Sequence, residues 1–241
     1  MVPQIAARAE GRAERVQPDL LVWLGVIAAA WMAAYWLEVS GVAHVLHHHT
    51  IFHSGQILAG GLALLGVWQV MTAAMMLPGT LPVVLRISRA RARLVFVATY
   101  AAAWTCFAVV AFVGDMGLHA LVHGWPLAAR YESLIPAAVL GVAAAYQLSS
   151  GKRASLSACR KPFDGDGLLA AINYSRHCLA SGWALMLIMF AAGVADLVWM
   201  AVLALTMLGE KAFPSADGFR RVVGGALALL AVGTLMGGQF V

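Results

Sequence analysis

The sequence CLASGWALMLIMFAAGVADLVWMAVLALTML, from Cys178 to Leu208, decides what kind of fold this chain can adopt. It is an apolar run of about thirty residues, whereas about 20 are enough to span the hydrocarbon core of a bilayer as an α-helix. Its only charged side chain is Asp196. We expect the run to form one transmembrane helix that is too long to stand upright and bends near Gly193. The alternative is a short helical hairpin, which would add one membrane crossing.

Five further apolar runs lie outward from this one along the chain. Apolar residues make up 62% of the 241 residues and charged residues only 11%, which excludes an ordinary soluble domain with its roughly 25% of charged residues. Helices are expected because backbone polar groups must be satisfied within each segment inside lipid. The sequence therefore predicts an all-α polytopic transmembrane helix bundle with six spans, or seven with the hairpin. The five runs are Leu20–Leu37, Ile57–Leu77, Leu94–Val113, Leu134–Leu148 and Val222–Val241.

The Lys and Arg residues cluster between the apolar runs and predict the orientation in the membrane. We expect a cytoplasmic N-terminal tail over residues 1–19, followed by a single transmembrane domain over 20–241 whose first span is not cleaved. A signal-peptide cleavage site at Gly41–Ala43 is the alternative. With both termini inside, twelve Lys and Arg residues lie on the inner side and four on the outer side. The outer four are Arg130, Lys211, Arg220 and Arg221, of which the hairpin would move the last three inside.

A histidine-rich segment follows the first span, in the outer loop expected over residues 38–56. If this segment is helical, His44 and His48 form one i,i+4 pair, and His49 and His53 form another. Imidazole suits zinc, copper, nickel and iron. The segment is thus a candidate metal site, and the alternative is a solvated segment at the membrane interface.

A second set of metal-ligand side chains lies at the outer end of the third span. Asp115, His119 and His123 follow one another at intervals of four residues, so that each step rises about 6 Å along a helix. Only adjacent members of the set can share an ion, and the other ligands must come from elsewhere. Asp196 lies at about the same depth and is our candidate partner for His119 or His123, because an acid within a span is costly and generally functional. The alternatives are a helix cap at Asp115 and a hydrogen bond from Asp196 to a neighbouring helix.

Sulfur-bearing side chains are also frequent. Methionines recur at helical spacing in the second span and in the long run, and thioethers favour Cu(I), although such methionines more often serve packing. Cys159 and Cys178 are expected on the reducing inner side, so we predict no structural disulfide between them. His177 is the only histidine expected on the same side, so these residues provide few ligands for a metal site.

The spacing of Trp, Met and Cys resembles a bacterial family of predicted metal-binding integral membrane proteins, catalogued as domain of unknown function number 2182. The resemblance covers roughly residues 57–230. It implies a polytopic helical protein of the bacterial inner membrane with a link to metals and no established activity. Such proteins often carry cysteines just before the Trp183–Met186 stretch, where this chain has Ser181 and Gly182. The motifs that carry the resemblance are Trp68-x2-Met71-x3-Met75-Met76-x-Pro78, Tyr146–Leu148, Lys152, Cys159–Arg160, Pro162, Cys178–Leu179, Trp183–Met186, Gly193–Val194, Trp199–Ala201 and Glu210–Lys211.

These features favour a membrane protein that binds a transition metal at its outer face, in metal handling or as a metal-holding subunit. Copper is the favoured ion, with zinc and iron as alternatives. A second hypothesis is a non-catalytic subunit or assembly factor of a larger membrane complex. A third is a metal-dependent membrane oxidoreductase that uses Asp115, His119 and His123. The expected partners are the lipid bilayer and other membrane-protein subunits, and no nucleic acid is expected because the cations flank apolar runs.

Overall fold

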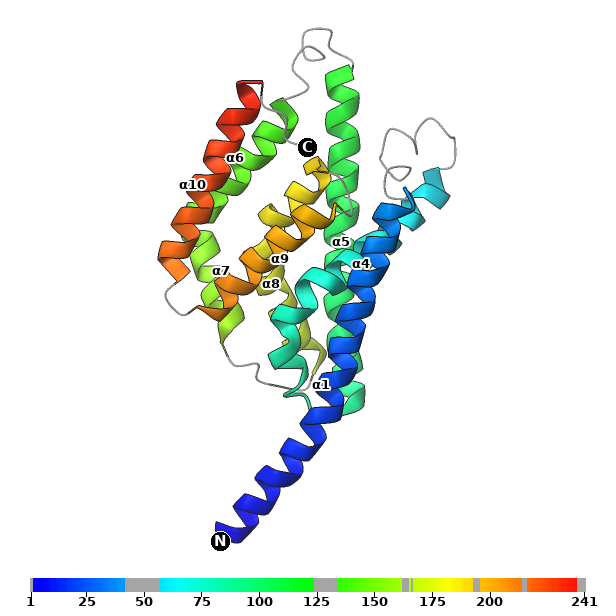
Figure 1. The fold of residues 1–241 in the computed structure, drawn as a ribbon, viewed down its shortest axis with the longest axis vertical. Helices are drawn as coiled ribbons and strands as arrows, with labels where there is room; N and C mark the ends of the chain where they lie inside the picture. The colour runs from blue at the N-terminus through cyan, green and yellow to red at the C-terminus, as the bar shows by residue number, and fades with distance from the viewer. Residues whose placement is uncertain are drawn as a thin grey trace.

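The computed structural model describes residues 2–41, 57–123, 134–161, 165, 167–192, 196–213 and 216–237. Over these residues every regular element is an α-helix, as predicted (Figure 1). The helices are α1 (Val2–Val39), α4 (Ile57–Val84), α5 (Ala90–His123), α6 (Leu134–Leu148), α7 (Ser150–Arg160), α8 (Leu168–Ala192), α9 (Leu197–Ala212) and α10 (Ala216–Leu235).

Five of these helices are long and apolar enough to cross a membrane. They carry four of the six predicted runs and the first part of the long run. They are α1, α4, α5, α8 and α10. A sixth span results if α6 and α7 are taken together, although the two helices are bent by 65° at Ser149. The Ser149 side chain produces this break, because its hydroxyl accepts a hydrogen bond from the Lys152 backbone N–H at 3.1 Å and caps α7.

The long run Cys178–Leu208 does not form one bent helix, and that prediction is wrong. α8 ends at Ala192, and a separate helix, α9, begins at Leu197. The two run in opposite directions: Lys211 contacts Cys178, whereas Met207, one turn earlier in α9, lies beside Gly182, one turn later in α8. The hairpin alternative therefore describes this segment. α9 has 16 residues, a length of about 24 Å.

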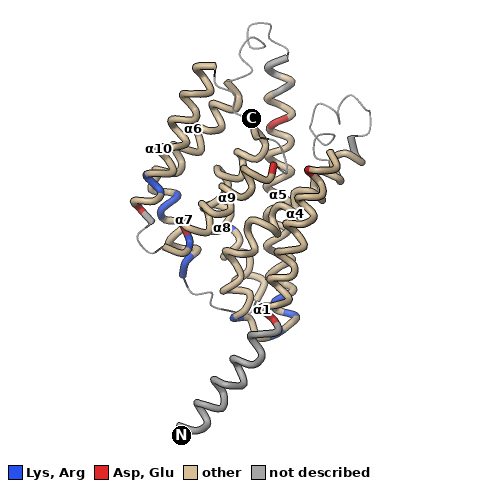
Figure 2. Tube along the Cα trace, viewed as in Figure 1, with Lys and Arg blue, Asp and Glu red and all other residues tan. Residues whose placement is uncertain are grey.

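The hairpin brings Lys211 and Arg220 to the same end of the bundle as the basic residues around α7. Lys211 lies beside Cys178, near the start of α8, and Arg220 donates to the Gln147 carbonyl at the end of α6. Their predicted position on the opposite side is therefore wrong. Figure 2 shows the Lys and Arg residues at the lower part of the described bundle, around α7, the start of α10 and the foot of α1 and α5. We call this end the basic end.

Side-chain contacts fix the direction of the remaining helices. Asp19 pairs with Arg93 at 2.9 Å, which places the α1 residue that begins the apolar stretch beside the start of α5. Tyr100 contacts Cys178 and Phe96 contacts Tyr174, so α5 and α8 are parallel and in register. Helices α1, α5, α8 and α10 accordingly leave the basic end, while α4, α6 and α9 return to it (Figure 1). The last described residues of α10 thus lie at the end opposite the start of α1.

The core lies between α4, α5, α8 and α9 and is built from large apolar side chains. Trp68 is fully buried and donates its indole N–H to the Trp104 carbonyl at 3.1 Å, which ties α4 to α5. Many large apolar side chains instead point outward, including Leu21, Val110 and Leu229. An exposed apolar surface of this kind is expected where a helix faces lipid or a partner protein.

Candidate functional site

The predicted outer metal site is only partly within the described residues. The segment that carries His44, His48, His49 and His53 lies outside them. His119 and His123 lie on α5, but the placement of their side chains is outside the described part. Among the described residues, no group of three or more His, Cys, Asp and Glu side chains is close enough to hold a metal ion. The outer site therefore stays a prediction.

The backbone does place the candidates at one end of the molecule. α5 continues without a break from Ala90 to His123, so Asp115 does not cap a helix end, and that alternative does not hold. Asp196 precedes Lys211 by fifteen residues at the start of α9, and Lys211 contacts Cys178, so Asp196 lies about 22 Å above Cys178. Asp115 lies fifteen residues after Tyr100 on α5, and Tyr100 also contacts Cys178, so Asp115 has a similar rise. Both residues lie at the end of the bundle opposite the basic end.

Asp196 has a clear structural role at this end. It is the N-cap of α9, and its Oδ1 accepts a hydrogen bond from the Trp199 backbone N–H at 2.8 Å. The break between α8 and α9 explains this bond, since the first amides of a helix lack partners within it. The sequence analysis named His119 or His123 as the partner of Asp196, with a hydrogen bond to a neighbouring helix as the alternative, and did not foresee this cap. Oδ1 is occupied by the cap.

Seven methionines meet in the core where α4, α8 and α9 pack together. All are at most 5% exposed, so they line the interior of the protein and do not face lipid. Gly182 shows how closely they gather: a Cβ at this position would lie 3.5 Å from Met76 Cε and 3.6 Å from Met207 Sδ. These are ordinary van der Waals distances, so Met76 of α4 and Met207 of α9 pack directly against α8 at Gly182. We call this set the methionine core: Met71, Met75, Met76, Met186, Met189, Met200 and Met207.

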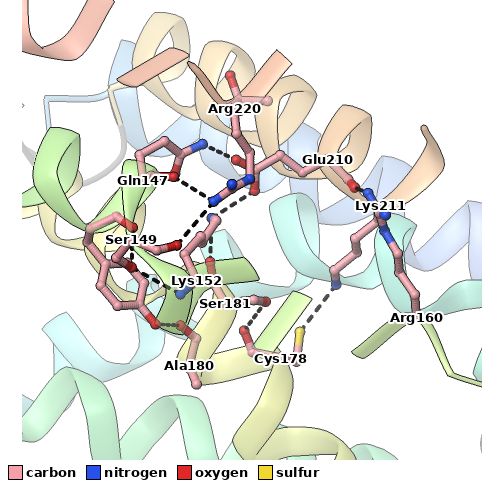
Figure 3. Close-up of polar contacts among 12 residues, drawn as sticks. Gln147, Ser149, Lys152, Arg160, Cys178, Ala180, Ser181, Glu210, Lys211 and Arg220 are labelled. Carbon is pink, nitrogen blue, oxygen red and sulfur yellow. Dashed lines mark hydrogen bonds and ion pairs between the residues drawn. The ribbon is translucent and has the colours of Figure 1, made fainter. Parts of the chain in front are cut away.

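A buried thiol cluster lies one turn below Gly182, toward the basic end, and Figure 3 shows its contact between Cys178 and Lys211. Cys178 Sγ is 3.1 Å from Tyr100 Oη and 3.2 Å from Lys211 Nζ. The Cys159 side chain interacts with that of Cys178, and Tyr174 interacts with Cys159. All three cysteines of the chain are free thiols, and Cys106 is exposed on α5, away from the other two. The sequence analysis missed Tyr100 and Lys211 as partners of Cys178, because two other helices, α5 and α9, bring them to it. It also missed Tyr174, which lies one turn before Cys178 on α8.

A buried ion pair adjoins the thiol cluster (Figure 3). Lys152 Nζ lies 2.7 Å from Glu210 Oε2, and the two side chains are 1% and 2% exposed. Lys152 also donates to the Ser181 carbonyl at 2.5 Å, and Gln147 donates to Glu210 Oε1. Both charges are therefore compensated by polar partners, as a charge buried in a protein interior requires.

Two arginines fasten helix ends around this pair. Arg220 donates to the Gln147 carbonyl at 2.8 Å, at the C-terminal end of α6. Arg160 donates to the carbonyls of Glu210 and Phe213, the latter at 2.6 Å, at the C-terminal end of α9. Cations are favoured there because the last carbonyls of a helix lack partners and carry partial negative charge. This network of four charged side chains fixes α7 against α6, α9 and α10.

Comparison with known proteins supplies a family. A family described as PpoB2, copper chaperone, has a sequence model that matches residues 65–234. The match includes the methionine core, the thiol cluster, the buried ion pair, Asp115, His119, His123 and Asp196, and it leaves out the segment from His44 to His53. No match was found among curated proteins or among solved structures.

Proposed function

Because the chain belongs to the PpoB2 copper chaperone family, we propose that it is an integral membrane protein that binds copper at its outer face and passes Cu(I) onward through thioether contacts. The methionine core carries this proposal. Thioethers are soft, uncharged ligands that prefer Cu(I) over harder divalent ions. Seven of them, collected from three helices in a dry interior, suit an ion that must be held without being oxidised.

The placement of the methionines along the bundle supports a route. Met200 lies one turn into α9, about 6 Å from the Asp196 end of the bundle, and Met207 lies about 10 Å further toward the basic end. Met207 meets Met76 at Gly182. A copper ion that enters near Asp196 would thus find thioether sulfur at successive depths.

We propose that the entry site uses Asp115, His119 and His123, with Asp196 or the His44–His53 segment as the source of further ligands. Imidazole binds a metal ion only in its neutral form. Copper affinity at the entry site should therefore fall as the pH drops through the ordinary histidine range near 6.5.

The distribution of charge supports a definite orientation in the membrane. With Lys211, Arg220 and Arg221 added to the twelve inner cations, fifteen of the sixteen Lys and Arg residues belong to one side, and Arg130 alone belongs to the other. By the positive-inside rule, the basic end faces the cytoplasm. We therefore propose a cytoplasmic N-terminus and a C-terminus on the outer side, in the bacterial inner membrane with lipid around the exposed apolar faces.

A measurement of bound copper distinguishes a copper-binding protein from a non-catalytic subunit that only packs against its partners. The full chain is expressed with copper in excess, purified in detergent, and assayed for copper by elemental analysis. His119→Ala should lose most of the bound copper and His123→Ala much of it. Arg153→Ala is the control, because Arg153 lies on α7 with a side chain that is 58% exposed and belongs to neither candidate copper site. A wild type without copper, or full copper in both α5 variants, would overturn the entry site.

The methionine core is tested by exchanging thioethers for hydrocarbon. Met76→Leu and Met207→Leu keep nearly the same volume, a change that usually costs less than about 1.5 kcal/mol of stability. Both should weaken Cu(I) binding while the protein remains folded. Met236→Leu serves as the control, since Met236 is 83% exposed beyond the end of α10. Equal Cu(I) affinity in all three variants would show that the core only packs.

A further inference from the structure

We infer that Cys159 and Cys178 form a two-thiolate Cu(I) site at the basic end of the methionine core, with Lys211 as its counter-cation. The inference rests on the proposed copper function and adds to it the site from which the ion leaves the core. It takes Cu(I) and not Cu(II), since thiolates are soft ligands and two of them suffice for a linear Cu(I) complex.

The two thiols are already together and reduced. Cys159 comes from α7 and Cys178 from α8, both are free and buried, and their side chains interact with each other. Both are buried, at 6% and 1% exposure, so a bound ion would be screened from water and oxygen. The hydroxyls of Tyr100 and Tyr174 contact the two thiols from the remaining sides. Such hydroxyls can donate hydrogen bonds to a thiolate and orient it.

Lys211 supplies the positive charge that a two-thiolate copper complex requires. Two thiols that bind one Cu⁺ release two protons and leave a complex with one net negative charge, [Cu(SR)₂]⁻. A negative charge in this interior requires a cation, and the Lys211 ammonium already donates to Cys178 Sγ at 3.2 Å. The neighbouring Glu210 is engaged by Lys152 and Gln147, so the Lys211 charge remains for the thiolates.

The backbone of α4 makes room for Lys211. A Cβ at Gly79 would lie 3.0 Å from Lys211 Cδ and 3.1 Å from Lys211 Nζ, so a side chain at this position would push the ammonium away. Gly79 therefore permits the close approach of α4 that seals the thiol cluster on this side. The site is built from α4, α5, α7, α8 and α9.

The site also lies where the thioether contacts end. Cys178 is one turn of α8, about 6 Å, below Gly182, where Met76 and Met207 meet. Thiolates are charged and bind Cu(I) more tightly than neutral thioethers, so an ion in the methionine core gains stability by moving to the cysteines. The order of ligands thus gives transfer a direction, from the Asp196 end toward the basic end.

Anaerobic titration with Cu(I) tests the site in the reduced, purified full chain. A competing Cu(I) chelator reports affinity, and the ultraviolet charge-transfer band reports thiolate ligation. Cys159→Ser and Cys178→Ser should each abolish the band and the tightest binding event. Cys106→Ser should leave both unchanged, because Cys106 is exposed on α5 and outside the cluster. Lys211→Met should keep the band but weaken this binding event by about tenfold to hundredfold, the usual effect of removing a partner that supports a metal ligand.

The outcomes distinguish this inference from the proposed function. If wild type binds Cu(I) but both cysteine variants keep its affinity and band, the thiolate site is wrong and the copper function stands. If wild type binds no Cu(I), both fail. Size-exclusion profiles and helical content by circular dichroism must match wild type for each variant used, and Cys178→Ala replaces Cys178→Ser should the serine variant fail this requirement.

Discussion

Replacing Lys152 by methionine should be among the most destabilising single substitutions in this protein. The substitution keeps the length of the side chain but removes the ammonium that lies 2.7 Å from Glu210. Glu210 then keeps only the hydrogen bond from Gln147, at a side-chain exposure of 2%. Breaking a buried ion pair on one side typically costs about 3–5 kcal/mol of unfolding free energy, because the remaining charge is left uncompensated. We expect a loss in this range at pH 7.

Two comparisons make the result interpretable. The double variant Lys152→Met, Glu210→Gln removes both charges and should recover to within about 1 kcal/mol of wild type, since a buried pair contributes little net stability over neutral groups. Arg153→Met breaks the pair with Asp217, whose atoms are 3.7 Å apart and whose side chains are 58% and 56% exposed. That exposed pair should contribute less than about 1 kcal/mol.

The measurement is the unfolding free energy in mixed micelles, obtained by titration with a denaturing detergent and followed by circular dichroism. If Lys152→Met costs no more than Arg153→Met, the pair is not buried as described. If the double variant is as unstable as the sum of its single variants, the two charges do not interact. Either result would refute the reasoning from burial and distance.

Three further predictions follow from local geometry. Gly224→Ala would place a Cβ 2.8 Å from Leu148 Cδ2 of α6, so the half-exposed Leu148 side chain must move, and we expect a loss of up to about 1 kcal/mol of unfolding free energy. Gly225→Ala, with nothing within 4 Å of its Cβ, should be neutral or stabilising, and equal unfolding free energies of the two variants would contradict this prediction. Asp196→Ala should cost about 1 kcal/mol of unfolding free energy through loss of the α9 cap, whereas Asp196→Asn should keep the cap. An alanine variant as stable as wild type would refute the cap. Loss of copper from the asparagine variant, in which the cap is kept, would identify the carboxylate as a ligand. A reporter inserted after Lys161 should be active in the cytoplasm and one fused to the C-terminus in the periplasm, and two cytoplasmic reporters would contradict the α8–α9 hairpin.

Much of the fold could be predicted from single segments of the sequence. Whether a run such as Leu94–Val113 forms a spanning helix depends on its own length and hydropathy, and the structure has such a helix there. The division of the Cys178–Leu208 run was harder to predict, because its only charged residue is Asp196. One charged residue in a long apolar run is compatible with a bend, a ligand or a helix cap. The choice became clear only from the contacts of Lys211 and Met207 with α8.

The candidate site likewise combines features that the sequence reveals with features that it does not. The frequency of methionine and the two inner cysteines could be noted from the sequence, but their grouping could not, since it depends on which helix faces are buried together. Lys152 and Glu210 were quoted only as part of a family resemblance. Their separation along the chain gives no sign that they meet, and each alone resembles a solvated charge at the end of a span.

By itself, the sequence determined that the chain is helical, that its helices are long and apolar enough to cross a membrane, and that its cations lie between the apolar runs. These properties are local, because backbone hydrogen bonds and transfer from water act on each segment separately. Only the tertiary structure decided that α9 turns back along α8, that Lys211 meets Cys178 and that Lys152 meets Glu210. Those contacts join segments that are distant in sequence. Which helix faces pack together depends on the whole bundle, and buried charges are stable only where that packing places a partner beside them.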